Sequence, residues 1–362
     1  MKLLVIWRLL TVGGVNAGWR NRAIFFKKHG IDIEFLYCKD LGGLHMMKDV
    51  APVYVTNDEN EIHHLLEHNH YDVVIVVDTN QAYKWLSHTN FKGPILIEAR
   101  TPEIIKLKRN LEGFDKVKPT KFVVPSEHQR RVLSILVKHN SPTEVIYNGV
   151  DTSFFRKLPE DQIDLTADPP IASNKKIVAY IGRLDQRKNW KQLIKIARLV
   201  QSERDDIEFW VIGGDQSKDR TKFENQRNKQ QLNEVIKWFP VIPYQQMPHL
   251  YAKIKQTGGC TIATTKGESF GNTFIEAMAC GVPVVAPNVS SIPEIVVHKK
   301  TGYLFYENHI KEAAKSIYTI LDDPTLYEHL SNASIQRVDN YFSISKCADK
   351  YIQMLHNVLK ES

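Results

Sequence analysis

The chain has 362 residues, which at roughly 150 residues per domain predicts two domains. Hydrophobic residues make up 43% and charged residues 25%, a composition that excludes a disordered chain and a small stapled module. Lysine plus arginine outnumber aspartate plus glutamate by 48 to 41. This basic balance favours anionic partners such as phosphates, nucleotides, acidic glycans or a lipid surface, whereas nothing in the sequence supports nucleic acid.

The first apolar stretch, residues 3–7, is interrupted by Arg8. It is shorter than the roughly 7 to 15 apolar residues of a secretory signal, so we interpret it as a strand. No apolar run approaches the roughly 18 residues of a membrane span. The four cysteines are scattered without metal or redox spacing, which indicates reduced core residues. We therefore expect a cytoplasmic protein, with peripheral contact at the inner face of the membrane left open.

Short apolar runs alternate with longer segments of helical period, a pattern typical of an α/β chain with parallel sheets. The runs fall into two series. The first series comprises residues 3–7, 33–38, 53–55, 73–77, 95–99, 122–125 and 145–147, with helices expected over segments such as 16–29 and 127–139. The second series comprises residues 177–181, 207–212, 241–244, 261–264, 282–286 and 303–305.

Between the two series lies a proline-containing stretch, residues 156–174, with few large apolar residues. Its prolines argue against a continuous helix or a central strand. We predict an N-terminal Rossmann-like domain over 1–165, a linker over 166–175 and a C-terminal Rossmann-like domain over 176–340. Residues 345–359, within a tail of 341–362, have the spacing of an amphipathic helix. The predicted architecture is two parallel sheets that face each other across a central cleft.

The most informative segment is 267–283, which has the signals of a loop, a helix and the start of a strand. Gly267 and Gly271 permit a tight turn, and Gly281 ends the helix. A helix N-terminus approached by glycine is suited to anion binding. Glu268 precedes this helix, and Glu276 lies two turns into it.

This segment resembles retaining nucleotide-sugar glycosyltransferases of family four, which have the GT-B fold, and the resemblance covers nearly the whole chain. It implies that Glu268 is a catalytic residue that holds the hydroxyls of the donor sugar and that Glu276 binds the nucleotide ribose. The alternative makes Glu268 a capping carboxylate and Glu276 a solvated helix residue. The resemblance also implies contacts to the sugar and the diphosphate from Ser269, Phe270, Gly271, Asn272 and Thr273.

A second segment, 182–188, follows a strand and precedes a helix, which places its cations at the carboxyl end of that strand. It resembles the diphosphate clamp of the same family. By that resemblance, Arg183 and Lys188 are catalytic and neutralise the charge that builds on the leaving diphosphate. Arg187 is an alternative cation that we rank lower.

Three weaker glycine motifs also resemble the family. Gly13 and Gly14 look like the N-terminal loop that meets the donor from the first domain. Asn148 and Gly149 look like an interdomain turn with a structural role. Residues 211–215 look like the turn near the nucleotide, and by the family's pattern Tyr244 and Met247 are candidate contacts of the base.

The sequence departs from the family at residues 97–101. Many members end this strand with a histidine that contacts the donor sugar, whereas this chain has Glu98 and Arg100. Either residue is a candidate contact of the donor or the acceptor, and an internal salt bridge is the equally weighted alternative.

Residues 104–121 carry six cations against two carboxylates. Ile104, Leu107, Leu111 and Phe114 have the spacing of an apolar stripe. The favoured interpretation is a core-facing stripe with a solvated basic back, and the alternative is a patch that binds the acceptor or a lipid surface.

The resemblance implies a metal-independent, retaining transfer of a hexose. The partners are a nucleotide-diphosphate sugar, with a UDP-sugar favoured, and a glycan, a lipid-linked molecule or another hydroxyl acceptor. The resemblance assigns the acceptor to the first domain, the donor to the second, and the tail after Asn340 to a segment that returns to the first. No cofactor is expected, because the sequence has no Asp-x-Asp cluster to hold a metal. The alternatives are an epimerase or phosphorylase on the same fold, and a non-catalytic coat protein that binds glycans or nucleotides.

Overall fold

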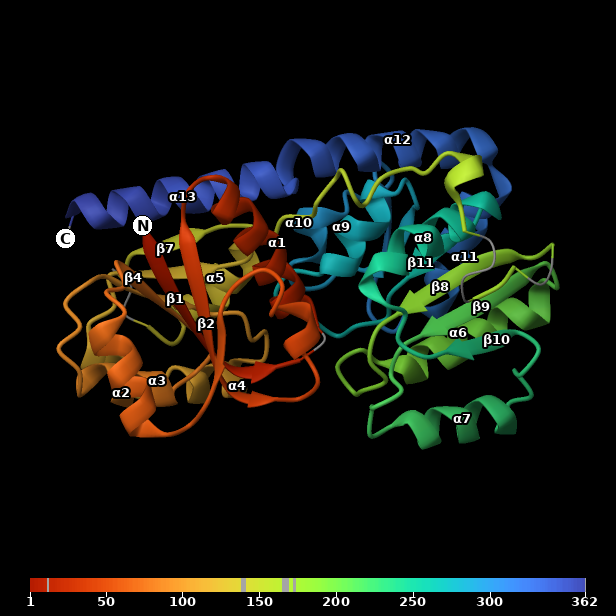
Figure 1. Cartoon of the computed structure of the whole chain (residues 1–362). Coiled ribbons are helices and arrows are strands. Elements are labelled where there is room, and N and C mark those ends of the chain that lie inside the picture. The colour runs from red at the N-terminus through yellow and green to blue at the C-terminus, as the bar shows by residue number, and fades with distance from the viewer. Residues whose placement is uncertain (12, 138–140, 165–168, 172–173, 362) are drawn as a thin grey trace. The chain divides into compact units, whose positions relative to one another are not determined.

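The computed structural model describes residues 1–11, 13–137, 141–164, 169–171 and 174–361. The chain forms two compact units, which we call unit 1 (Met1–Asp151 and Phe342–Ser362) and unit 2 (Thr152–Tyr341). Figure 1 traces their elements along the chain. Val12, the end of the helix expected over 127–139 and part of the linker expected over 166–175 lie outside the described residues.

Unit 1 contains a seven-stranded parallel sheet with the strand order β3-β2-β1-β4-β5-β6-β7. Its strands are β1 (Lys2–Leu10), β2 (Asp32–Asp40), β3 (Val53–Val55), β4 (Val73–Val77), β5 (Ile95–Glu98), β6 (Lys121–Val124) and β7 (Thr143–Val145). The order reverses between β1 and β4, and ligands of such sheets bind beyond the carboxyl ends of the strands at this point.

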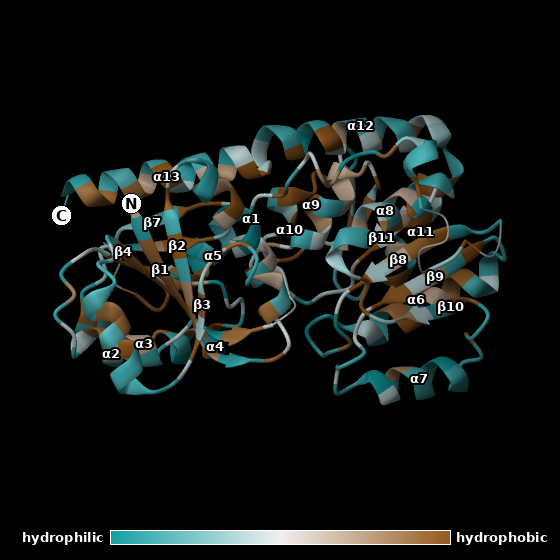
Figure 2. Ribbon diagram, viewed as in Figure 1, coloured by the Kyte–Doolittle hydropathy of each residue, from teal (hydrophilic) through white to brown (hydrophobic). Residues whose placement is uncertain are grey.

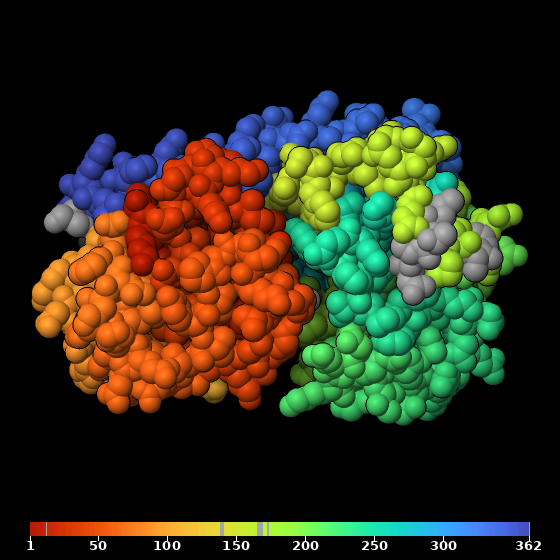
Figure 3. Space-filling view, in the orientation of Figure 1, coloured from red at the N-terminus to blue at the C-terminus, as the bar shows by residue number. Residues whose placement is uncertain are grey.

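The main helices of unit 1 are α1 (Gly14–Lys28), α2 (Glu59–His68), α3 (Gln81–Ser87), α4 (Ile104–Asn110), α5 (Glu127–Ser134) and α13 (Ile344–Glu361). The last of these comes from the end of the chain and packs on α1. Trp19 and Tyr351 meet edge to face there, with their ring centroids 5.8 Å apart. In Figure 3 the blue α13 runs along the surface of unit 1 beside the red N-terminal segment.

Unit 2 contains a six-stranded parallel sheet with the strand order β10-β9-β8-β11-β12-β13. Its strands are β8 (Lys176–Ile181), β9 (Ile207–Ile212), β10 (Ile236–Phe239), β11 (Cys260–Ile262), β12 (Val284–Pro287) and β13 (Gly302–Phe305). Its helices are α6 (Trp190–Glu203), α7 (Arg220–Lys229), α8 (Met247–Gln256), α9 (Asn272–Ala279), α10 (Ile292–Ile295), α11 (Ile310–Asp322) and α12 (Pro324–Tyr341). Figure 2 shows brown, hydrophobic stretches in β1 and β9, whereas α7 is largely teal. The two sheets confirm the predicted class, an α/β chain with two Rossmann-like parallel sheets.

One predicted strand is wrong. The sequence pattern predicts a strand over 241–244, but the strand in this region is β10, and Tyr244 begins a short 3-10 turn. Pro240 and Pro243 flank the apolar pair at 241 and 242, and a proline cannot donate a hydrogen bond to a neighbouring strand. The strand that pairs with β9 therefore lies before Pro240, and its first residue, Ile236, pairs with Phe209.

The first boundary between the units lies at Asp151 and Thr152, before the linker expected over 166–175. Phe155 explains this position, because its ring is fully buried and packs against Tyr244 and Tyr251 of unit 2. The segment that follows Thr152 therefore belongs to unit 2 by packing, despite its prolines.

Candidate functional site

The loop after β8 is folded around Asp185. Its carboxylate accepts a hydrogen bond from the backbone N–H of Lys188 at 2.8 Å and pairs with Arg183 at 2.9 Å. Burial opposes the charged form, but these two contacts hold the pKa of Asp185 below its ordinary value. The buried Tyr180 hydroxyl donates to the carbonyl groups of Arg183 and Lys188. The loop that carries the predicted clamp is therefore fixed from both sides.

Glu268 forms the centre of the site. Its Oε1 accepts a hydrogen bond from Lys188 Nζ at 2.7 Å, and its Oε2 accepts one from Arg187 Nη1 at 2.7 Å. Burial favours the neutral acid, yet Lys188 and Arg187 lower the pKa of Glu268 to about 2. We call these three residues the Glu268 cluster. It is a compact, ionised group that carries one net positive charge.

The two candidate arginines, Arg183 and Arg187, have different surroundings in the structure, and the one that contacts Glu268 is the one that the sequence analysis ranked lower. Arg187, ranked lower, contacts Glu268 and also donates to the carbonyl of Gly267 at 2.9 Å. Arg183 lies at the rim of the loop, where its side chain is 65% exposed and pairs with Asp185. Arg183 therefore remains accessible to a ligand, and Arg187 acts as a support for Glu268.

The loop between β11 and α9 is joined to the loop after β8 by hydroxyl groups. Thr264 donates to the carbonyl of Lys188 at 3.0 Å, and Thr265 donates to that of Arg187 at 3.2 Å. Behind them, the buried Ser291 hydroxyl lies within hydrogen-bond distance of the carbonyls of Glu268 and Phe270. These contacts hold the Glu268 cluster at the edge of the sheet where β8 and β11 end.

Helix α9 begins beside this cluster. Gly271, its N-cap residue, has φ of +129°, and a Cβ atom there would lie 2.5 Å from the Phe274 ring. Only glycine fits this conformation and this space. Among the described residues, no side chain caps the helix, and the partial positive charge of its N-terminus adds to that of the cluster. The sequence-based prediction of an anion-binding turn thus has a structural basis at Gly271.

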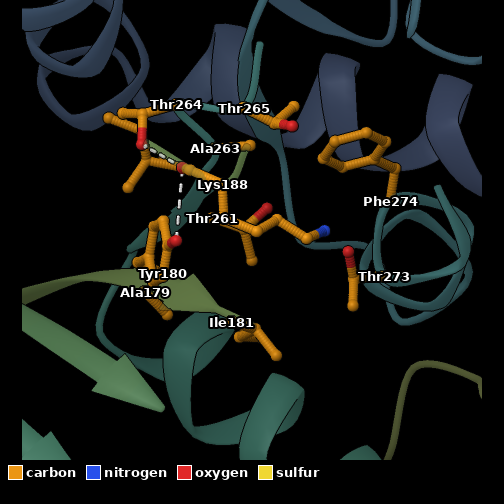
Figure 4. A pocket seen from close by; sticks show the side chains of 11 residues that line it. Ala179, Tyr180, Ile181, Lys188, Thr261, Ala263, Thr264, Thr265, Thr273 and Phe274 are labelled. Carbon is orange, nitrogen blue, oxygen red and sulfur yellow. Dashed lines mark hydrogen bonds between the residues drawn. The ribbon is translucent and has the colours of Figure 1, made fainter. Parts of the chain in front are cut away.

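A pocket lies at the carboxyl ends of β8 and β11 (Figure 4). Its lining residues are Ala179, Tyr180, Ile181, Lys188, Thr261, Ile262, Ala263, Thr264, Thr265, Thr273 and Phe274. Figure 4 shows the ammonium group of Lys188 and the hydroxyl group of Thr273 pointing toward one another. Lys188 therefore contributes both to the Glu268 cluster and to the wall of this pocket.

Glu276 lies on α9 in very different surroundings. Its Oε2 accepts a hydrogen bond from the buried Tyr251 hydroxyl at 3.2 Å. Burial raises the pKa of Glu276 to about 7, and the Tyr251 contact opposes this rise. Sequence reasoning missed Tyr251, because a tyrosine on an amphipathic helix has no pattern that distinguishes it from a core residue.

The candidate base contacts have structural partners within unit 2. Tyr244 stacks on Phe154, with the ring centroids 5.5 Å apart, and Met247 is buried. Gly213 approaches the loop after β8 closely, because a Cβ atom there would lie 3.2 Å from the carbonyl oxygen of Gly182. The nucleotide contacts of Tyr244 and Met247 stay predictions.

In unit 1, Glu98 and Arg100 belong to a buried network. Glu98 accepts hydrogen bonds from Arg100, from Arg22 at 3.4 Å and from the Tyr351 hydroxyl at 2.8 Å. Arg100 also donates to Asn148 Oδ1 at 2.7 Å. We call these five residues the Glu98 network. It favours the internal salt bridge over a substrate contact for Glu98, because Glu98 is 1% exposed and both of its carboxylate oxygens accept hydrogen bonds from protein groups.

Gly13 and Gly14 begin α1 at the carboxyl end of β1. The extended backbone at Gly13, with φ of −176°, suits any residue, and a Cβ atom would make only an ordinary contact with Thr11 at 3.6 Å. Neither backbone conformation nor packing therefore requires glycine at position 13. The sequence pattern suggested close approach by a ligand as the reason for glycine at position 13, and this explanation stays a prediction.

Solved structures resemble the chain over its whole length. HepE from Anabaena, in complex with UDP and glucose, superposes with a TM-score of 0.84 at 19% identity, over 99% of this chain and 100% of that chain. TarM from S. aureus, in complex with fondaparinux, alpha-GlcNAc-glycerol and UDP, gives a TM-score of 0.79 at 14% identity, over 98% and 99% of the two chains. These likenesses and the two Rossmann-like units define the class: the chain has the GT-B fold.

A comparison with family models matches one part of the chain. Residues 161–337 match the family described as "Glycosyl transferases group 1". The match lies within unit 2, and together with the fold it confirms the recognition of a GT-B glycosyltransferase from the sequence motifs.

Curated relatives match only part of their own length. N-acetyl-alpha-D-glucosaminyl L-malate synthase from Bacillus anthracis is 24% identical over 226 residues, which cover 62% of this chain and 56% of the relative. Sucrose synthase from Solanum tuberosum is 28% identical over 195 residues, which cover 50% of this chain and 24% of the relative. The matches thus span between about a quarter and somewhat more than half of these two relatives. Within the described residues, no helix combines the length and apolar character needed to cross a bilayer.

Proposed function

We propose that the protein is a retaining glycosyltransferase of family four that moves a hexose from a nucleotide-diphosphate donor, preferably a UDP-sugar, to a hydroxyl acceptor. The observation that carries the proposal is the Glu268 cluster at the N-terminus of α9, which gathers cations and helix dipole at one sheet edge. A diphosphate is the ligand that such a field suits best. The family match of unit 2 and the UDP bound to HepE support the same choice.

In this proposal the diphosphate lies at the start of α9, near the backbone of residues 269–273. Arg183 and Lys188 oppose the charge that grows on the leaving phosphate. Glu268, held by Arg187, accepts hydrogen bonds from the donor sugar. Glu276 binds the ribose, and the acceptor belongs to unit 1. Electrostatic stabilisation that is in place before the reaction commonly lowers the barrier more than any other effect.

The proposed reaction proceeds on one face of the sugar. The acceptor oxygen forms a bond to the anomeric carbon while the bond from that carbon to the diphosphate oxygen breaks. The acceptor proton passes to the departing phosphate oxygen, so no protein nucleophile is needed and the anomeric configuration is retained. Proton NMR of the product is the test of this mechanism, and an inverted anomer would overturn it.

The proposal includes metal independence, because the Glu268 cluster and the helix terminus supply positive potential where a metal acts in other enzymes. Treatment with EDTA is therefore expected to leave the rate nearly unchanged. Loss of activity in EDTA with rescue by manganese would contradict this part of the proposal.

For the acceptor and the location, we propose a glycan or lipid-linked hydroxyl and a cytoplasmic protein that contacts an anionic membrane surface. The start of α4 supports this choice. Leu107 and Leu111 are buried as the apolar stripe predicts, but Ile104 is 40% exposed and Ile105 is 78% exposed. Apolar side chains among lysines and arginines are typical of helices that lie in a lipid interface.

The most direct test of the donor site is a thermal shift with UDP, GDP and ADP. A nucleotide at a hundred times its dissociation constant should stabilise the fold by about 2.7 kcal/mol. Incubation with UDP-sugars without acceptor is expected to release UDP by slow hydrolysis. Conversion of the donor to an epimer would indicate an epimerase, and no shift with any nucleotide would refute the donor site.

A further inference from the structure

Glu276 has one hydrogen-bond partner among the residues that the structure describes, the hydroxyl group of Tyr251. The contact is made to Oε2 at 3.2 Å and leaves Oε1 without a protein partner in the same described part of the chain. The carboxylate therefore has one oxygen fixed by the protein and one oxygen available to a ligand. A carboxylate that is partly withdrawn from water and has few polar partners is costly to ionise, so this single contact influences its protonation state.

Tyr251 is itself held firmly. It lies on α8, is 0% exposed, and meets the ring of Phe155 edge to face with the centroids 6.2 Å apart. Its hydroxyl oxygen is also 3.4 Å from the carbonyl oxygen of Thr273, in the first turn of α9. One hydroxyl group thus sets the position of the start of α9 and of Glu276 together.

We propose that Tyr251 is a positioning residue that orients the Glu276 carboxylate toward the two ribose hydroxyls of the nucleotide donor. The inference rests on the proposed function, since it concerns the ligand of the same site. A carboxylate fixed in advance loses less conformational entropy when it binds a diol. The Tyr251 contact also opposes the rise of the Glu276 pKa and so favours the ionised form, the better acceptor.

The test compares UDP with its 2′,3′-dideoxy analogue by calorimetry on the full chain. The variants are Tyr251→Phe, Glu276→Gln and the double variant. Tyr251→Phe is expected to weaken the binding of UDP by about 3- to 10-fold, which lies within the range for the loss of one typical hydrogen bond. Binding of the dideoxy analogue should change less than twofold. In the Glu276→Gln background, Tyr251→Phe should add no further loss, because the group it orients is already replaced.

Tyr327→Phe is the matched control. Tyr327 is 5% exposed, lies in unit 2 and donates to the carbonyl of Gly259 at 2.9 Å, so its variant loses a comparable buried hydrogen bond away from Glu276. It should bind UDP like the wild type. In turnover, Tyr251→Phe should raise the donor KM and leave kcat within about twofold.

Equal UDP binding by Tyr251→Phe and the wild type would overturn the inference while the donor site stands. Equal weakening of UDP and its dideoxy analogue would also overturn it, because a general loss of structure does not depend on the ribose. A wild type that binds no nucleotide would overturn the proposed function, and this inference with it.

Discussion

Glu268 and Glu276 lie eight positions apart in the sequence, yet their surroundings shift their pKa values in opposite directions. Lys188 and Arg187 outweigh burial at Glu268 and bring its pKa to about 2. At Glu276 burial prevails, with only the Tyr251 hydroxyl against it, and the pKa is about 7. At neutral pH one carboxyl is fully ionised while the other is near its midpoint. Such divergence is typical of functional sites.

The low pKa of Glu268 predicts a contribution to acid stability. Because the pKa is lower in the folded chain than the ordinary 4.5, this stabilisation is complete above about pH 4.5 and is lost as the pH falls toward 2. We therefore expect the free energy of unfolding of Glu268→Gln to depend less steeply on pH than that of the wild type in this window. The difference in slope should reach up to about 1.4 kcal/mol per pH unit, as measured by chemical unfolding. Glu112→Gln, an exposed change of the same charge, is the control and should keep the wild-type slope.

The raised pKa of Glu276 predicts the opposite sign. The pKa of Glu276 in the folded chain lies above the ordinary 4.5. The contribution of this carboxyl to the free energy of unfolding is therefore fully present at low pH and is lost as the pH rises from about 4.5 through 7. Glu276→Gln removes this loss and should raise the melting temperature relative to the wild type at pH 8 but not at pH 4. A lower melting temperature of Glu276→Gln at pH 8 would contradict the partly buried state of this carboxyl with its single hydrogen-bond partner.

Turnover should separate the cations from Glu276. Arg183→Ala and Lys188→Ala are expected to lower kcat by about 100-fold or more, because each charge opposes charge that grows in the transition state. Glu276→Ala should mainly raise the donor KM, since ribose contacts form equally in the ground and transition states. Lys195→Ala, an exposed lysine on α6, should match the wild type. Equal losses of kcat in all three site variants would refute the division of roles.

At the scale of elements, the period of the apolar residues predicted most strands and helices, because buried parallel strands are short continuous apolar runs. The prediction of a strand over 241–244 was wrong because this apolar run is flanked by prolines, which cannot donate hydrogen bonds to a neighbouring strand. The candidate site was predictable where glycines mark a turn, as at Gly271. The partnership of Arg187 with Glu268 was not, since 81 positions separate them and only the loop geometry decides which of two cations meets the carboxylate.

Helix α4 carries a prediction of its own. Ile105→Glu should reduce sedimentation with vesicles of phosphatidylglycerol and phosphatidylethanolamine by about 10-fold or more, because it places a charge in the proposed lipid contact. Tyr306→Glu, which changes a 63% exposed aromatic residue of unit 2, is the control and should sediment like the wild type. Both variants should have the wild-type melting temperature. Binding of the wild type to phosphatidylcholine vesicles with equal strength would argue against the charge-based part of the contact.

At the scale of the whole molecule, the end of the chain is part of the core of unit 1. Tyr351, Leu355 and Val358 are each 0% exposed. Deletion of residues 342–362 should therefore unfold unit 1 and abolish transfer, because a buried helix face and the Glu98 network are lost together. Unit 2 should still bind UDP within a few-fold of the wild type. Proteolysis of the truncated chain is the readout, and a protected unit 1 would contradict the prediction.

The chain enters and leaves unit 2 at one point of unit 1. Val150 and Ser343 form a parallel bridge, and a Cβ atom at Gly149 would lie only 2.6 Å from the Cα atom of Ile344. Unit 2 is thus an insertion whose two ends are neighbours, and unit 1 is discontinuous in sequence. During synthesis residues 152–341 are complete before α13 leaves the ribosome, so unit 2 can reach its native state while unit 1 still lacks one wall of its core. Unit 1, although it includes the first residues of the chain, therefore cannot complete its core until unit 2 has been synthesised.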